Sequence, residues 1–190
     1  MKILETIVAT CNENGSTHLA PMGVWEADSY IVLAPFRPSK TLDNLMRVPY
    51  AVINRIDDVR VFAGCLSGRK TWPLIAVEQM VAKRLAVALS HMEVKIVKSK
   101  DDEVRPKLYA EVLHEAIHAP FVGFNRAQFA VIELAILVSR LDRLPPEKIL
   151  AEIDYLKIAL DKTAGANELE AWSWLMECVE QKLQLQSDTS

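Results

Sequence analysis

The stretch LAPFRPSKTLDNLM, residues Leu33–Met46, decides the fold expected for the first half of the chain. An apolar run ends at two prolines, and a short helix-forming segment begins after them. Ser39 or Thr41 suits the N-cap of that helix, and Asp43 suits its first turn. Arg37 and the two hydroxyls stand where a helix leaves unpaired N–H groups, a favourable place for phosphate. The stretch therefore indicates either an ordinary capped surface helix or a phosphate-binding site.

Short strands separated by turn signals are expected on both sides of this stretch. They recur at intervals of about ten residues, which is typical of a barrel or sandwich. LAVALSHMEVKIV and KLYAEVLHEAIHA are expected to pair as long antiparallel strands, although their Ala, Leu and Glu content favours helix. The other expected strands are LETIVATC, THLAPMGVWEA, YIVLAPF, YAVINRI and VRVFAGCL.

The character of the chain changes after Pro120. Helix-forming residues dominate from there, and Pro145-Pro146 and Gly165 divide them into three helical segments. The first of these contains FAVIELAILV, which is apolar on nearly every side and is expected to be buried. The predicted fold class is α+β, with a β-barrel domain over residues 1–120 followed by a C-terminal three-helix unit over residues 121–190.

Composition narrows the possible partners and the location. The net charge of -3 gives no basic surface for nucleic acid or an anionic membrane, so neither is expected as a partner. The apolar run Phe129–Val138 is far shorter than the ~20 residues that span a bilayer. Three widely spaced cysteines without a CxxC motif fit reduced thiols. A cytoplasmic protein is expected.

The segment LAPMGV places Pro21 and Gly23 inside an otherwise strand-like run. Proline removes a hydrogen-bond donor from a sheet, and glycine in a strand often marks a bulge or close approach of a ligand. A flat ring could lie against such a surface while its phosphate reaches the start of the next helix.

The chain resembles the FMN-binding split-barrel proteins. The resemblance lies in VAT..ENGSTHLAPMGV, PFRPSKTLDNL and AVINRIDDVRVFA, which occur in this order. With GFNRAQFAVIELAILVSRL, the chain is similar to one prokaryotic branch of that group, labelled domain of unknown function 447 and known from archaea and from bacteria with one-carbon metabolism. The resemblance extends to about Leu144 and is weakest between Arg69 and Val104.

The resemblance implies a homodimer that binds FMN at or near the subunit interface, as a flavin-dependent oxidoreductase of unknown substrate. It implies no particular catalytic acid or base. An alternative is a non-catalytic flavin or pterin binding protein linked to one-carbon metabolism. By matching position, the implied flavin-binding residues are Arg37, Ser39, Thr41 and Asn44 for the phosphate, Ala20, Pro21, Met22 and Gly23 for the ring, and Asn54, Asn125 and Arg126 nearby.

A competing motif is HEAIH, His114 to His118, which fits the HExxH pattern of zinc hydrolases. That pattern needs a helix to bring both histidines to one metal. If the segment is a strand, the two residues lie about 13 Å apart and cannot share one zinc ion. In that case alternation puts Glu115 on the opposite face from His114. No metal is therefore expected, and the zinc hydrolase remains the weaker hypothesis.

Overall fold

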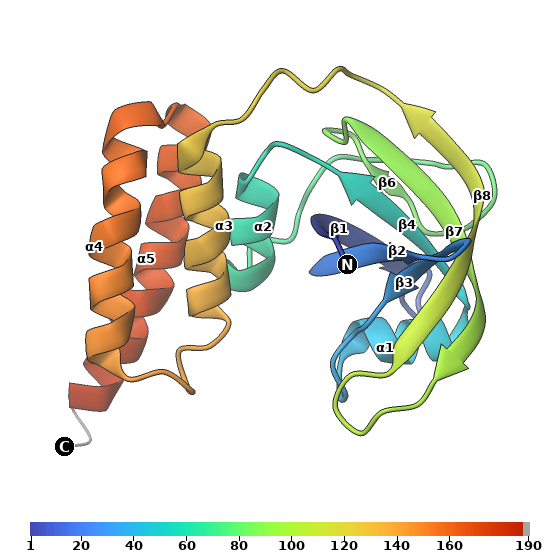
Figure 1. The fold of residues 1–190 in the computed structure, drawn as a ribbon, viewed down its shortest axis with the longest axis horizontal. Helices are drawn as coiled ribbons and strands as arrows, with labels where there is room; N and C mark the ends of the chain where they lie inside the picture. The colour runs from blue at the N-terminus through green and yellow to red at the C-terminus, as the bar shows by residue number, and fades with distance from the viewer. Residues whose placement is uncertain (188–190) are drawn as a thin grey trace. The chain divides into compact units, whose positions relative to one another are not determined.

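The computed structural model describes residues 1–187 and divides into two compact units (Figure 1). The first unit comprises residues 1–56 and 72–121, and the second comprises residues 57–71 together with the chain from residue 122 onward. Residues 57–71 thus belong with the C-terminal helices, although sequence analysis placed them in the barrel domain. None of the described helices combines the length and the apolar character that crossing a bilayer requires.

The first unit is a closed barrel with the strand order β1-β2-β3-β8-β7-β4, in which every neighbouring pair is antiparallel. Its interior core is aliphatic and includes Val8, Ile53 and Val94, all fully buried. One helix, α1 (Lys40–Arg47), contacts β1. The barrel strands are β1 (Ile3–Cys11), β2 (Thr17–Ala27), β3 (Tyr30–Leu33), β4 (Tyr50–Arg55), β7 (Ser90–Lys100) and β8 (Lys107–Ile117).

The strand β2 is only partly enclosed by its neighbours. It pairs with β1 from Thr17 to Trp25, but it pairs with β3 only over Val24–Ala27. Among the described residues, positions 17–23 therefore have a strand neighbour on one side alone. This open stretch is where proline is tolerated in a sheet, since the missing donor disrupts no ladder on the open side.

The long antiparallel pair of β7 and β8 is confirmed. Alternate residues of β7 face the two sides of the sheet, so Met92 and Val94 enter the barrel core while His91 and Glu93 face outward. The outward side chains are also buried. The segment that covers them contains the two short strands β5 (Leu74–Ile75) and β6 (Arg84–Leu85). Burial on both faces outweighs the helical propensity of the sequence.

The expected strand VRVFAGCL is wrong, because this segment forms the helix α2 (Arg60–Ser67). A short apolar run has no periodicity that separates a strand from a buried helix. Local signals favour the helix: the Asp58 carboxylate accepts a hydrogen bond from the backbone N–H of Arg60 at 3.1 Å. At the other end, Gly68 adopts the left-handed conformation with φ 83°, which stops the helix.

The second unit packs α2 with the three C-terminal helices predicted from the sequence. Asn125 caps α3, and Pro146 occupies the first turn of α4. Their shared core includes Ala63 of α2, Leu134 and Leu175, all fully buried. The C-terminal helices are α3 (Arg126–Val138), α4 (Pro146–Thr163) and α5 (Ala166–Ser187).

Candidate functional site

The four residues expected to face a flavin ring, Ala20 to Gly23, lie on the open part of β2. They are half-buried and pair only with β1, where Gly23 stands opposite Glu5. A Cβ atom added at Gly23 would lie 2.6 Å from Cγ2 of Ile3. Packing against the neighbouring strand β1 is therefore enough to require glycine at position 23.

The start of α1 presents unpaired hydrogen-bond donors. The hydroxyl oxygen of Ser39 accepts a hydrogen bond from the backbone N–H of Leu42 at 3.2 Å and so caps the helix. The backbone N–H groups of Lys40 and Thr41, and the Thr41 hydroxyl, have no hydrogen-bond partner among the described residues. Beside them, a hollow of about 330 Å³ is lined by Lys40 and three residues of the β1–β2 turn, Asn12, Glu13 and Asn14.

The Arg37 guanidinium precedes this helix and is engaged at the surface. Its Nη2 atom lies 3.0 Å from Oδ1 of Asp101, and both side chains are largely exposed. An exposed ion pair of this kind contributes little to stability and is readily exchanged for another anion. Arg37 is thus available to a phosphate group at the start of α1.

Asn44 has a structural task on the buried side of α1. It is buried, and its Nδ2 atom donates to Oγ1 of Thr10 and to Oδ1 of Asn12, each at 3.0 Å. Both acceptors lie at the end of β1 and in the turn after it. The amide group of Asn44 therefore joins α1 to the barrel, and its donors are used inside the protein.

Asn54 is also committed inside the barrel unit. It is fully buried, and its amide nitrogen donates to the carbonyl oxygen of Ile7 at 3.0 Å and, at 3.4 Å, to that of Val52. Its amide oxygen accepts the backbone N–H of Leu85 at 2.8 Å. These bonds satisfy its donors and its acceptor, so Asn54 positions the covering segment and offers nothing to a ligand.

Asn125 and Arg126 lie in the helical unit. The Asn125 side-chain oxygen accepts the backbone N–H groups of Ala127 and Gln128, and its nitrogen donates to the carbonyl oxygen of Thr163. Arg126, the first residue of α3, is exposed. The local role of Asn125 is therefore to cap α3 and to join it to the end of α4.

The HExxH hypothesis fails on secondary structure. His114 lies within β8, which extends to Ile117, so the two histidines of the motif do not share one helical face. Glu115 lies on the opposite side of β8 from His114, as alternation predicts, and forms an ion pair with Arg55. A zinc hydrolase built on this motif is thereby excluded.

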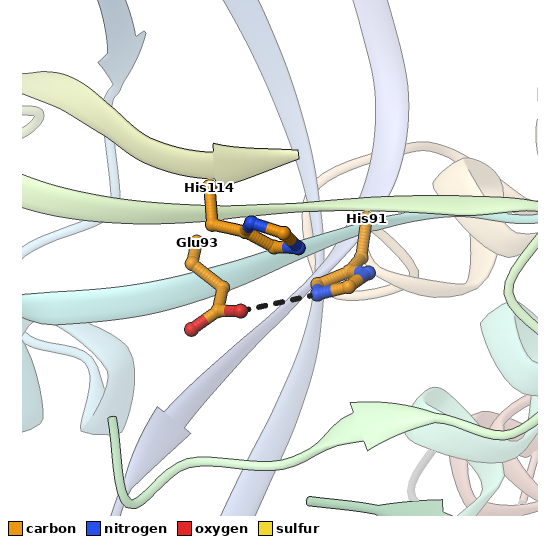
Figure 2. A group of neighbouring side chains, drawn as sticks. All are labelled: His91, Glu93 and His114. Carbon is orange, nitrogen blue, oxygen red and sulfur yellow. Dashed lines mark hydrogen bonds and ion pairs between the residues drawn. The ribbon is translucent and has the colours of Figure 1, made fainter. Parts of the chain in front are cut away.

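The structure instead joins His114 to two residues that sequence analysis missed, His91 and Glu93 (Figure 2). His91 and Glu93 are alternate residues of β7, and Glu93 stands directly opposite His114 on β8. Nε2 of His91 lies 3.4 Å from Oε1 of Glu93. One ligand atom from each of the three residues lies within 4.8 Å of the others.

A second pair of contacts surrounds this His-Glu-His cluster. Nδ1 of His91 lies 2.9 Å from Nε2 of His118, and the two rings are stacked. Burial lowers the pKa of His91 and of His118, and the nearby charge of Arg84 lowers both further. The hydrogen bond and charge of Glu93 oppose this lowering of the His91 pKa without cancelling it. Both rings are therefore neutral at pH 7, the form in which a histidine binds metal or accepts a hydrogen bond.

Two family models together match most of the chain. The model described as "Protein of unknown function (DUF447) N-terminal domain" matches residues 4–119, and that described as "Protein of unknown function (DUF447)" matches residues 125–177. No curated protein matches the chain.

Solved structures share the fold. The FMN-bound protein MM1853 from Methanosarcina mazei, of the DUF447 family, superimposes with a TM-score of 0.82 at 19% identity over 93% of this chain and 94% of that one. A flavoredoxin from Methanosarcina acetivorans gives 0.52 at 14% identity, covering 61% of this chain and 69% of that one. The 2-nitrobenzoate 2-nitroreductase NbaA from Pseudomonas fluorescens gives 0.52 at 19% identity, covering 60% and 64%. The predicted split barrel with C-terminal helices is confirmed.

Proposed function

Because the chain belongs to the DUF447 family, we propose that it is an FMN-binding protein that acts as a flavin-dependent oxidoreductase. The main support for this proposal is the set of unpaired N–H groups at the start of α1, since such groups bind phosphate readily. MM1853, which has the same fold over nearly its whole length, is FMN-bound. Bound FMN would supply the redox chemistry, and the protein would bind and orient it.

The phosphate group would be held by the backbone N–H groups of Lys40 and Thr41, by the hydroxyls of Ser39 and Thr41, and by Arg37. The dipole of α1 adds a partial positive charge at the same point. Ser39 uses its oxygen as the cap acceptor, which leaves its hydroxyl hydrogen free to donate. Asn44 and Asn54 are not part of this proposal, because their amide donors, which a phosphate would need, are used within the barrel unit.

The ring would lie along the open part of β2, against Ala20 to Gly23. Small residues and a proline leave a low surface there, and positions 17–23 have no strand beside them on the β3 side among the described residues. The turn that follows β1 joins this region to α1 through Asn12 and Asn44. The ring surface and the phosphate donors thus belong to one connected part of the barrel unit.

A homodimer is part of the proposal. The barrel unit exposes apolar side chains that a second subunit could cover: on β8, Ile117 is 80% exposed, and Val112 and Leu113 are more than 40% exposed. Large apolar side chains exposed along one strand can mark an interface, and an isologous dimer is the commonest assembly. Light scattering of the FMN-loaded protein at micromolar concentration tests this, and a monomer would contradict it.

The test of FMN binding is a comparison of FMN with riboflavin by fluorescence titration. Each charge-assisted hydrogen bond to the phosphate contributes about 1.5–3 kcal/mol, so two such bonds favour FMN by well over tenfold. Equal affinity for the two flavins would reject the phosphate site.

Catalysis needs its own measurement, because a non-catalytic flavin or pterin carrier remains the alternative. An oxidoreductase turns over a reductant or an acceptor repeatedly, whereas a carrier gives only a stoichiometric spectral change. Stopped-flow reduction of the bound flavin by NADH or NADPH, followed by repeated reoxidation, distinguishes the two. Flavin that is bound but never turned over would favour the carrier.

A further inference from the structure

Three of the four histidines of the chain gather at one place on the outer face of the barrel. His91 lies between the other two, with ring centroids 5.9 Å from His114 and 5.0 Å from His118. Glu93 completes the group (Figure 2). We propose that His91, Glu93 and His114 form a binding site for a divalent transition metal, with Zn²⁺ as the ion that this donor set suits.

The positions of the ligand atoms fit such an ion. Two imidazole nitrogens and one carboxylate oxygen are a common zinc donor set, and ligand atoms around a tetrahedral zinc ion lie about 3.3 Å apart. Nε2 of His91 and Oε1 of Glu93 are 3.4 Å apart, which matches this spacing. The third ligand atom lies within 4.8 Å of both, so a rotation of the half-buried His114 ring closes the site. The His114 ring makes no hydrogen bond to another described residue, so it can turn about its side-chain bonds.

Glu93 supplies the electrostatic reason for a cation. Its side chain is fully buried, and it accepts backbone N–H groups from Gln79 at 2.7 Å and Glu78 at 3.3 Å. Within the described residues, no lysine or arginine forms an ion pair with Glu93, and its ionisable partner is His91. A buried carboxylate that no lysine or arginine pairs with is costly, and a metal ion would compensate it.

His118 provides the support that metal-binding histidines usually have. A ligating imidazole commonly donates its second N–H to a neighbouring acceptor, which fixes its tautomer and orientation. In this structure Nδ1 of His91 lies 2.9 Å from Nε2 of His118. With His91 bound to metal through Nε2, its Nδ1–H would donate to Nε2 of neutral His118. His118 is therefore a positioning residue rather than a fourth ligand.

Arg84 carries a positive charge near His91 and His118, and, besides burial, this charge lowers the pKa of both rings. Its guanidinium donates to the carbonyl oxygen of Leu85 at 3.0 Å and forms no ion pair with Glu93. Arg84 therefore does not neutralise the carboxylate. Its charge also weakens the binding of any cation, so the affinity for Zn²⁺ should be lower than that of a site without it.

The experiment measures Zn²⁺ bound to untagged full-length protein after equilibrium dialysis, by mass spectrometry of the metal. The expected result is about one Zn²⁺ per chain, a count that is unaffected by removal of flavin. His114→Ala is expected to weaken binding on the order of 100-fold or more, and His118→Ala about tenfold. Glu115→Gln is the matched control: it neutralises the residue next to His114 on the other face of β8 and should leave Zn²⁺ binding unchanged.

Circular dichroism and urea denaturation check that each variant folds. His114 and His118 are the residues chosen for substitution because they are partly exposed, so replacing them disturbs the fold least. Zn²⁺ should also raise the melting temperature of the wild-type protein and not that of His114→Ala. Zn²⁺ uptake that is the same in the wild type and in His114→Ala overturns the proposal. So does a loss of uptake in Glu115→Gln as large as that in His114→Ala. Neither result bears on FMN binding, which concerns other residues.

Discussion

The amide oxygen of Asn54 accepts the backbone N–H of Leu85 at 2.8 Å, and so fastens the segment that covers the outer face of the barrel. Both residues are fully buried. Leu85 belongs to the short strand β6, which pairs with β5 and with no other strand of the described residues. The Asn54 side chain thus holds β6 to the barrel with a hydrogen bond, where longer strands are held by a ladder of backbone hydrogen bonds.

Replacing Asn54 by alanine should destabilise the protein without changing its affinity for FMN. The substitution leaves the N–H of Leu85 without its acceptor and the carbonyl of Ile7 without this donor. Buried groups of this kind cost about 1–3 kcal/mol each, so the free energy of unfolding should fall by roughly 2–6 kcal/mol. Urea denaturation measures the loss, with the exposed Glu111→Ala as a control. A large drop in FMN affinity at unchanged stability would contradict the role assigned here.

Replacing Ser39 and Thr41 together by alanine should reduce the preference for FMN over riboflavin, while Arg37 and the backbone N–H groups keep part of it. Two hydroxyl donors to the phosphate are lost, so the ratio of the two affinities should move toward one. Loss of the Ser39 cap also costs about 1 kcal/mol of stability. The ratio separates the two effects, because a damaged helix would weaken both flavins while a lost phosphate contact weakens only FMN.

Neutralising Asp101 should strengthen FMN binding. Asp101 holds the Arg37 guanidinium at 3.0 Å and competes with a phosphate for it. Asp101→Asn removes that competitor together with a negative charge, whereas Arg37→Ala should weaken binding. Fluorescence titration at low and at high salt measures both changes, and the differences should shrink at high salt because the groups are exposed. Weaker binding by Asp101→Asn would show that Arg37 does not reach the phosphate.

Cys65 should resist alkylation in the folded protein. Burial raises the pKa of its thiol to about 11, so only about 0.1% of it is thiolate at pH 8. Reaction with iodoacetamide should therefore be roughly 100-fold slower than for an exposed cysteine, and it should accelerate as the pH approaches 11. Mass spectrometry of timed samples measures this, with protein in denaturant as the reference. Rapid labelling at pH 8 under native conditions would contradict the burial of Cys65.

Much of the fold follows from the sequence because its signals are local. The turn residues and β-branched runs predict the strands β1 to β4, and Pro145-Pro146 marks the start of α4. The helix α2 could not be predicted, because Val59 to Leu66 is a short apolar run that fits a strand and a buried helix equally. Its packing against α5, about a hundred residues later, selects the helix.

The candidate sites differ in how well the sequence predicts them. Ser39 and Thr41 stand at a helix start that the sequence itself marks. The family resemblance places Asn54 near the flavin by position, but the surroundings of Asn54 depend on Leu85, which no sequence pattern links to it. His91 and Glu93 were missed because their relation to His114 arises only from the register of β7 against β8. A signal did exist: three of the four histidines fall in two segments expected to pair.

The placement of α2 has a consequence for how the protein is made. The Arg60 side chain of α2 pairs with Glu170 of α5, 110 residues later in the chain. During synthesis α2 leaves the ribosome long before the helices that bury it. Its apolar side chains therefore stay without their packing partners until translation is nearly complete. Truncation after the barrel would leave this helix permanently without its partners. A fragment ending near residue 121 should therefore aggregate unless α2 is replaced by a short polar loop.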